Sequence, residues 1–207
     1  MLDLEPLLRP VKIDDLRPTQ MTVGFREVER KRRQWRARVE KDGGDYLGRH
    51  MIPVVIGPGG SHWMIDNHHL ARALHEEGVE KVLVRVIADL SDLKGRLFRT
   101  FMDNRNWLHP FDAEGHRREL AKIPRHVKGL TDDPYRSLAG ELRRAGGYAK
   151  DDTPYSEFLW ADFLRRRVSH HLVADKFESA VEKALRLAND RCAAYLPGWA
   201  GVEDATD

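Results

Sequence analysis

Residues 51 to 75 decide the fold, and they read Met51-Ile-Pro-Val-Val-Ile-Gly-Pro-Gly-Gly-Ser-His-Trp-Met-Ile-Asp-Asn-His-His-Leu-Ala-Arg-Ala-Leu-His75. Two short apolar runs, Ile52 to Ile56 and Trp63 to Ile65, flank a cluster of glycine, proline and serine. Apolar runs joined by such a turn predict a β-hairpin. The next segment has apolar residues at helical spacing and begins with Asp66 and Asn67, which are good N-cap residues. The sequence therefore predicts a hairpin that leads directly into a helix.

The polar side chains Asp66, Asn67, His68 and His69 stand at this predicted strand-to-helix junction. At the start of a helix the backbone N–H groups and the positive end of the dipole favour an anion such as phosphate. The same residues also suit an ordinary capped junction with two surface histidines. The pattern alone leaves both interpretations open.

The composition indicates a highly charged globular chain that is long enough to bury a core. Of its 207 residues, 33% are charged, and 35 basic residues nearly cancel 33 acidic ones. A net charge of +2 gives no broad nucleic-acid footprint. The single Cys192 excludes an internal disulfide framework and a cysteine-rich metal knuckle. With neither a secretory signal nor a membrane-length apolar run, we expect a cytoplasmic protein without a membrane partner.

The remaining chain predicts an α/β (α+β) unit followed by helices. Strands are expected at 11–16 and 81–90, and a long charged helix is expected at 25–41. The basic run Arg30 to Arg33 in this helix fits a solvated face better than a phosphate-contacting one. Further helices are expected at 93–105, 112–122, 135–145, 156–167 and 172–195. We therefore predict an α/β domain over 1–90, a helical subdomain over 91–198 and a flexible tail over 199–207.

Several long motifs resemble the ParB/sulfiredoxin superfamily, and the whole chain resembles its ParB-like nuclease family. The matching stretches are Leu16-Arg-Pro-Thr-Gln-Met-Thr-Val-Gly-Phe-Arg-Glu27, Ile52-Pro-Val-Val-Ile-Gly-Pro58, Ile65-Asp-Asn-His-His-Leu-Ala-Arg-Ala-Leu74, Asp133-Pro-Tyr-Arg-Ser-Leu-Ala139, Gly146-Gly-Tyr-Ala-Lys150 and Glu157-Phe-Leu-Trp-Ala-Asp-Phe-Leu-Arg165. The resemblance spans roughly residues 11 to 168 and implies a small mixed-sheet domain with a helical C-terminal extension.

Members of the superfamily hold nucleotide phosphates with a box at this junction: CTP in partition proteins, ATP in sulfiredoxins, ADP or ATP in free-serine kinases. The box here, Asp66 to His69, is most similar to that of the serine kinases. Asn67 replaces the usual glycine, which asparagine can do because it tolerates left-handed backbone angles. Leu70 replaces an arginine, and Arg72 can supply the missing charge. The sulfiredoxin cysteine would fall at His68, which excludes sulfinic-acid reduction.

The resemblance also implies roles for individual residues. Asp66 and His68 are the catalytic candidates, with Asp66 also the candidate Mg²⁺ ligand. The serine kinases place a glutamate that acts as general base just after an early proline. This chain reads Pro18-Thr19-Gln20 there and has no carboxylate, so Glu27 and Glu29 are the nearest candidates for that base. The candidate phosphate-binding residues are Asn67, His69, Arg72, Thr19 and Gln20. From the helical half, Arg136 and Lys150 are candidates for the acceptor side.

A metal site built by histidines alone is a weaker interpretation. His50, His62, His68 and His69 lie in one region, and His109 forms an imidazole–carboxylate pair with Asp112. Adjacent histidines of a helix point in different directions, so they rarely bind one ion together. A catalytic Mg²⁺ that accompanies a nucleotide is better supported, because a carboxylate and phosphate oxygens are its usual ligands.

These patterns predict a nucleotide-binding protein that uses ATP or ADP, with CTP as the third candidate, together with Mg²⁺. Its expected activity is phosphoryl transfer to a small molecule, or nucleotide hydrolysis. One alternative is a ParB-like DNA-binding protein or nuclease, and another is a non-catalytic module that senses a nucleotide. We expect His68→Ala and Asp66→Ala to weaken nucleotide binding and to leave the fold intact. The sequence names neither the acceptor nor an oligomeric state.

Overall fold

The structure is a computed structural model that describes residues 8–42 and 51–202 of the chain. Its contacts divide the chain into two compact units. The first unit comprises Met1–Val23 and Glu27–Asp132, and the second comprises Gly24–Arg26 and Asp133–Asp207. The predicted division into domains at 1–90, 91–198 and 199–207 stays a prediction.

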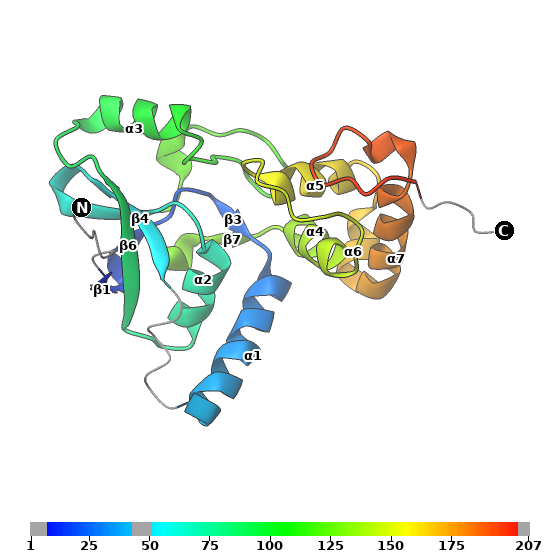
Figure 1. Cartoon of the computed structure of the whole chain (residues 1–207), viewed down its shortest axis with the longest axis horizontal. Helices are drawn as coiled ribbons and strands as arrows, with labels where there is room; N and C mark the ends of the chain where they lie inside the picture. The colour runs from blue at the N-terminus through cyan, green and yellow to red at the C-terminus, as the bar shows by residue number, and fades with distance from the viewer. Residues whose placement is uncertain (1–7, 43–50, 203–207) are drawn as a thin grey trace, which may run out of the picture. The chain divides into compact units, whose positions relative to one another are not determined.

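A mixed five-stranded sheet forms the centre of the first unit (Figure 1). Its strands are ordered β1-β6-β4-β5-β2. The pairs β1–β6 and β4–β5 are antiparallel, and the pairs β4–β6 and β2–β5 are parallel. The strand bounds are Leu8–Lys12 (β1), Leu16–Arg17 (β2), Ile52–Gly57 (β4), Ser61–Met64 (β5) and Lys81–Asp89 (β6).

The predicted hairpin is present as β4 and β5, joined by the short 3-10 turn Pro58–Gly60. Gly59 and Gly60 have positive φ angles of 68° and 74°, which glycine adopts without a steric penalty. The two strands pair from Val54↔Met64 to Gly57↔Ser61. The hairpin therefore delivers the chain to the start of the next helix, as the sequence predicts.

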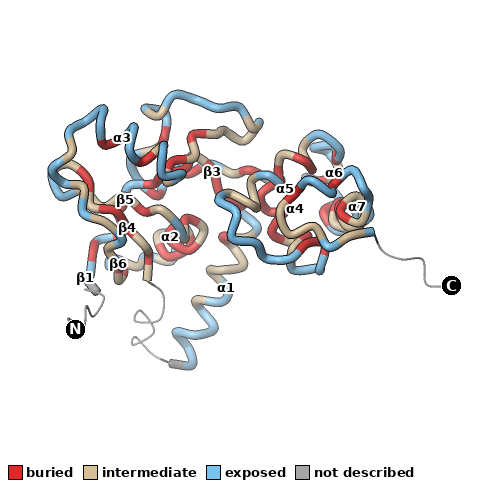
Figure 2. The backbone as a smooth tube through the Cα atoms, turned by 45° about the horizontal axis from the view of Figure 1, so that its top comes forward, coloured by how far each residue is buried: buried red, intermediate tan, exposed pale blue. Residues whose placement is uncertain are grey.

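Helices cover both faces of this sheet. Consecutive residues of a strand point to opposite faces, and Val54 packs in a core with α2 whereas Val55 packs in a core with α3. Figure 2 marks buried residues in the sheet strands and in α2, and exposed residues along much of α3. The helix bounds are Phe25–Asp42 (α1), His68–Glu76 (α2) and Gly95–Asn104 (α3). A separate two-stranded parallel ladder joins Thr22–Val23 (β3) to Thr131–Asp132 (β7).

The second unit is helical and has its own core. Its helices are Pro134–Arg144 (α4), Ser156–Arg165 (α5), His170–Asp175 (α6) and Phe177–Ala188 (α7), followed by the 3-10 turn Arg191–Ala193. Trp160 is fully buried, stacks on Tyr148 with ring centroids 4.4 Å apart, and donates its indole N–H to Pro197 O. Within the predicted tail, the Trp199 indole donates to Ala188 O, and residues 203–207 lie outside the described residues.

The mixed sheet and the helical second unit confirm the predicted fold class, but three elements differ from the expectation. The expected strand at 11–16 is interrupted by the 3-10 turn Ile13–Asp15. The helix expected at 112–122 is wrong, because Asp112 accepts the N–H groups of Glu114 and His116 in a local turn. The helix expected at 172–195 breaks at Lys176, whose φ of −138° and ψ of 61° are not helical.

No helix in the ranges 8–42 and 51–202 is long and apolar enough to cross a membrane. The candidate metal ligand His50 lies outside the described residues.

Candidate functional site

The strand-to-helix junction is a tight turn held by Asn67. This residue has φ 63° and ψ 28°, the left-handed conformation that was expected for an asparagine in the place of glycine. Its amide nitrogen donates to Met51 O at 3.1 Å, and its own N–H donates to Asp66 Oδ1 at 2.6 Å. The backbone hydrogen bonds of α2 then begin with Ala71 N–H donating to Asn67 O. The turn is thus fixed to the start of β4 as well as to the helix.

His68 is a buried hub rather than a surface residue. Only 4% of it is exposed, and its Nε2 lies 3.1 Å from the backbone nitrogen of Thr19 and 3.3 Å from the Thr19 hydroxyl. That hydroxyl donates to Met64 O at 2.8 Å. Because a backbone N–H can only donate, Nε2 must accept, so the ring is neutral and carries its proton on Nδ1. A contact from His68 to a phosphate would therefore use Nδ1–H.

The Thr19–Gln20 loop is buried beside this histidine and anchored on its other side. Thr19 and Gln20 are 2% and 6% exposed. Thr19 O accepts the backbone N–H of His109 at 2.8 Å, and Gln20 pairs with His109 as an isolated parallel bridge. The Gln20 side-chain amide donates to Thr22 O at 2.8 Å. The structure therefore brings the predicted residues Thr19, Gln20 and His68 together.

Asp66 and His69 occupy the outer side of the junction. Asp66 is exposed and His69 is partly buried. One oxygen of the Asp66 carboxylate accepts from the Asn67 N–H, which leaves its second oxygen for a cation. Among the described residues, no three or more histidine, cysteine or carboxylate side chains gather as a ready metal site. A Mg²⁺ ion at Asp66 would take its other ligands from phosphate oxygens and water.

Arg72 anchors a neighbouring loop. Its Nη1 donates to Lys128 O at 2.8 Å and to Leu130 O at 2.7 Å, and its Nε donates to Glu76 at 2.7 Å. Leu130 leads directly into β7, which pairs with β3 just after the Thr19–Gln20 loop. Arg72 therefore holds the loop before β7 in place. Its predicted contact with phosphate would have to be made in addition to these bonds.

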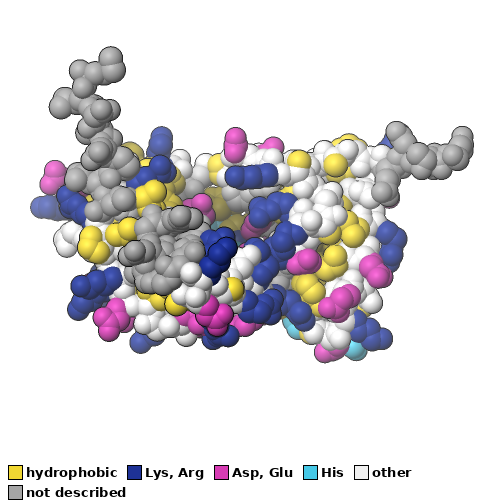
Figure 3. Space-filling view, turned by 60° about the horizontal axis from the view of Figure 1, so that its bottom comes forward, with side chains coloured by type: hydrophobic (Ala, Val, Ile, Leu, Met, Phe, Trp, Pro, Cys, Tyr) yellow, Lys and Arg dark blue, Asp and Glu magenta, His cyan; other side chains and the backbone are white. Residues whose placement is uncertain are grey.

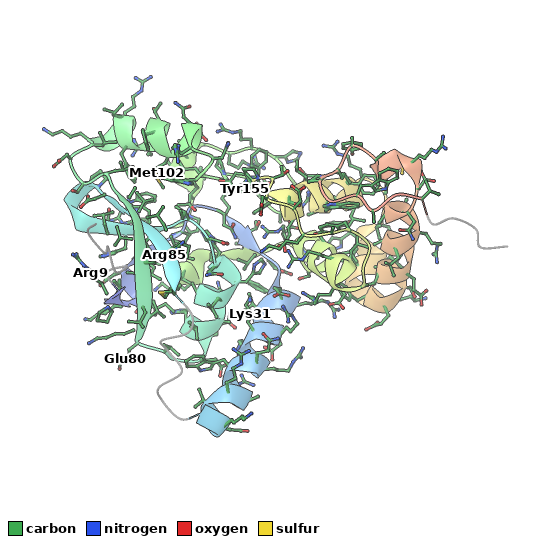
Figure 4. All side chains as sticks on the ribbon, in the orientation of Figure 1. Arg9, Lys31, Glu80, Arg85, Met102 and Tyr155 are labelled. Atoms are coloured by element: carbon green, nitrogen blue, oxygen red, sulfur yellow. The ribbon has the colours of Figure 1, made fainter. Side chains whose placement is uncertain are left out.

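The two candidate bases lie on α1 in ion pairs. Glu27 binds Arg30 at 2.6 Å and lies 3.8 Å from Lys31, a residue labelled in Figure 4. Glu29 binds Arg32 at 2.9 Å. A carboxylate that already neutralises a cation must break that pair to accept a proton. The role of Glu27 or Glu29 as general base stays a prediction.

Salt bridges join α1 to α2 within the first unit. Glu77 accepts from Arg36 at 2.7 Å and from Arg32 at 2.6 Å. The hydrogen bond from Arg36 is the main reason that the pKa of Glu77 falls to about 2. These contacts pair Arg32 and Arg36 of α1 with a protein carboxylate.

The candidates from the helical half both lie in the second unit. Lys150 is exposed, whereas Arg136 is buried in the first turn of α4. Their assignment to the acceptor stays a prediction.

Sequence reasoning missed the role of the chain around His109. Asp112 binds Arg118, and the His109 ring stacks on Phe111 with ring centroids 4.5 Å apart, so the pair of His109 with Asp112 stays a prediction. What His109 contributes is its backbone, which holds the Thr19–Gln20 loop. No residue type signals such a backbone contact, so the sequence could not have shown it.

Comparisons with known proteins agree with the resemblance. A family model described as "Putative ParB-like nuclease" matches residues 9–166. The crystal structure of protein Atu1540 from Agrobacterium tumefaciens is 52% identical, with a TM-score of 0.89, over 96% of this chain and 100% of that one. No protein of curated function matches.

A second solved structure is far more distant. It is the C-terminally truncated chromosome-partitioning protein ParB from Caulobacter crescentus, complexed with CTP-gamma-S. Its identity is 12%, over 86% of this chain and 91% of that one, and its TM-score of 0.32 is too low to support any argument about ligands. The family match rests instead on most of the chain and on both described units: the chain belongs to the ParB-like nuclease family and carries a ParB-like domain.

Proposed function

We propose that this chain binds a nucleotide by its phosphates at the Asp66–His69 turn. The observation that carries the proposal is the hydrogen bond between Thr19 N–H and His68 Nε2, 3.1 Å long. This bond fixes a polar loop against the first turn of α2, where the helix dipole favours an anion. The left-handed Asn67 tightens the turn, so that a phosphate could approach the backbone closely.

The residues present fit a nucleotide–Mg²⁺ pair. Phosphate oxygens accept hydrogen bonds, and the first turn of α2, His69 and His68 Nδ1–H are donors. Asp66 offers a carboxylate oxygen for Mg²⁺. A bound nucleotide would supply the phosphoryl group, and Mg²⁺ would neutralise its charge. ATP or ADP is the proposed nucleotide, and CTP is the third candidate.

The proposed activity is phosphoryl transfer from ATP or ADP to a small molecule, or hydrolysis of the nucleotide, in the cytoplasm. The protein must then orient the phosphates and remove a proton from the accepting hydroxyl. Asp66, Glu27 and Glu29 are the candidate carboxylates that would accept this proton. Replacing each of them in turn and measuring turnover identifies the general base. A catalytically inactive nucleotide sensor is the competing form of the same proposal.

Turnover separates the two forms. Full-length protein is incubated with ATP or ADP, Mg²⁺ and a panel of small alcohols and amino acids, and nucleotide consumption and phosphorylated product are measured. Acceptor-dependent consumption supports transfer, and acceptor-independent consumption supports hydrolysis. Binding without consumption in either case supports the sensor.

The family description supplies a second candidate, a nuclease or DNA-binding protein. The face shown in Figure 3 carries acidic as well as basic side chains. Acidic side chains on the same face weaken the long-range attraction to a polyanion. Duplex and single-stranded DNA incubated with the protein and Mg²⁺ test this candidate, and cleavage or salt-sensitive binding would favour it over the small-molecule activity.

A further inference from the structure

Arg136 is a buried arginine whose hydrogen-bonding groups are only partly used. It lies in the first turn of α4 and is 5% exposed. Within the part of the chain that the structure describes, its Nε and Nη1 have no acceptor. Buried arginine side chains are rare and are normally paired on all sides, because an unmatched buried donor costs several kcal/mol.

The nearby carboxylates do not account for this arginine. Glu157 lies 3.6 Å from Arg136 Nη2, beyond hydrogen-bonding distance, but it lies 2.6 Å from Arg143. Asp133 lies 2.5 Å from Arg165, which also pairs with Asp162. Each carboxylate next to Arg136 therefore has a closer arginine of its own. Arg136 interacts with both carboxylates by charge, but its Nε and Nη1 make no hydrogen bond to either of them.

The surroundings restrict how a ligand can reach the guanidinium. The Phe158 ring lies against it, with 3.4 Å between the Arg136 Cζ and the ring centroid, so one face is covered. Acceptors must then approach in the plane of the group, where its N–H bonds point. Planar approach with charge-assisted hydrogen bonds is how arginine recognises carboxylate and phosphate oxygens. Burial lowers the pKa of Arg136, which an anionic partner would oppose.

We propose that Arg136 anchors an oxyanion site in the second unit, where its Nε and Nη1 hydrogen-bond a carboxylate or phosphate group of a small ligand. The site lies apart in sequence from the Asp66–His69 turn, and the inference does not depend on nucleotide binding there. It explains why an arginine with two unmatched donor groups is kept in a buried position. A group kept for binding commonly lowers the stability of the empty protein.

The first test measures unfolding in urea for the full-length protein with inorganic phosphate or acetate as the probe, at constant ionic strength set by chloride. We expect at least one probe to stabilise the wild type with a saturating dependence. A probe at ten times its Kd should lower the unfolding equilibrium constant about elevenfold. The probe that acts identifies the class of oxyanion.

Two variants assign the effect to this residue. Arg136→Met should show no response to the probe and should be at least as stable as the probe-free wild type, since Glu157 and Asp133 keep their closer arginines. Arg144→Met is the control: it removes an arginine of the same helix that pairs with Glu141, and its side chain is 29% exposed. This control should retain the response of the wild type.

A direct spectroscopic test does not require the Met variant to fold. In ¹⁵N spectra the Arg136 Nε–H resonance, assigned by its loss in Arg136→Lys, should shift during titration with the same probe. The proposal is overturned if neither probe changes the stability or this resonance of the wild type. It is also overturned if Arg136→Met responds as the wild type does, or if that variant folds but unfolds more than tenfold more readily without any probe.

Discussion

The backbone N–H of Thr19 donates to Nε2 of His68 across 49 residues of sequence, at a distance of 3.1 Å. Both residues are buried, and the Thr19 hydroxyl continues the network to Met64 O. The bond therefore joins three segments: the loop after β2, the end of β5 and the first turn of α2. The proposed phosphate site exists only while these segments stay together.

Replacing His68 should destabilise the protein, contrary to the expectation from sequence that His68→Ala leaves the fold intact. The variant leaves the buried Thr19 N–H without an acceptor and opens a cavity, which together cost about 2–4 kcal/mol. His68→Gln should recover part of the loss, because its side-chain oxygen can accept the same bond. Urea unfolding measures the stabilities, and hydrogen exchange should show lost protection of the Thr19 amide in His68→Ala.

His75→Ala is the matched control for this prediction. His75 lies on the same helix, and its side chain is 26% exposed and faces Asp14 at 3.4 Å. Its replacement should leave the exchange rate of the Thr19 amide unchanged. Equal protection of that amide in His68→Ala and the wild type would contradict the account of His68 as a hub.

The left-handed conformation of Asn67 predicts a difference between two small substitutions. Asn67→Gly and Asn67→Ala both lose the bond to Met51 O, but only alanine meets the steric penalty of a positive φ. We expect the alanine variant to be less stable than the glycine variant by about 1–2 kcal/mol. Thermal or urea unfolding of the pair measures the difference, and an alanine variant as stable as the glycine variant would rule out the left-handed turn.

Arg72 should matter for stability whether or not it contacts a phosphate. Arg72→Met removes two short bonds from a charged donor to Lys128 O and Leu130 O, at an expected cost of about 2–3 kcal/mol. Arg85→Met, on the exposed side of β6, is the control and should change stability by less than about 0.5 kcal/mol. A loss of nucleotide affinity in Arg72→Met without loss of stability would instead identify Arg72 as a phosphate ligand only.

Asp133 predicts an unusual pH dependence of stability. Burial raises its pKa to about 6, against the favourable charge of Arg165, whereas an unfolded aspartate titrates near pH ~4. Between these values the folded state holds the proton more tightly, so Asp133 makes stability fall as the pH rises from about 4 to 6. Asp133→Asn cannot titrate and should remove this decline, roughly 2–3 kcal/mol in total.

Urea midpoints at several pH values from 4 to 7 measure the effect. Asp162→Asn is the control, because Asp162 shares Arg165 but its side chain is 37% exposed. The control should keep the slope of the wild type between pH 4 and 6. An identical slope in Asp133→Asn would show that Asp133 is not the group responsible.

Local patterns predicted most of the fold because local forces determine it. The hairpin β4–β5, the helix after Asn67 and the strand β6 have clear alternation, turn residues and caps. The prediction failed where a side chain competes with the helix, as Asp112 does, and where a single non-helical residue, Lys176, divides two helices. Neither feature changes the hydrophobic pattern on which the prediction depends.

The candidate site was predictable in its residue types but not in its burial. The motif identifies Asp66 to His69, and the structure adds that His68 is buried against a loop 49 residues away. Such a contact depends on the sheet order, which composition and periodicity do not encode. The burial of Arg136 was even less predictable from the sequence, because an arginine on a helix is ordinarily expected at the surface.

The measurement that tests the central claim most directly is calorimetric titration of the full-length protein with ATP, ADP and CTP, with and without Mg²⁺. We predict that one nucleotide binds and that its affinity falls at least tenfold without Mg²⁺. Asp66→Asn keeps the acceptor for the Asn67 N–H but lacks the charge, so it should lose most of this dependence on Mg²⁺. Absence of binding by all three nucleotides, or unchanged Mg²⁺-dependent binding in Asp66→Asn, would contradict the proposed phosphate site.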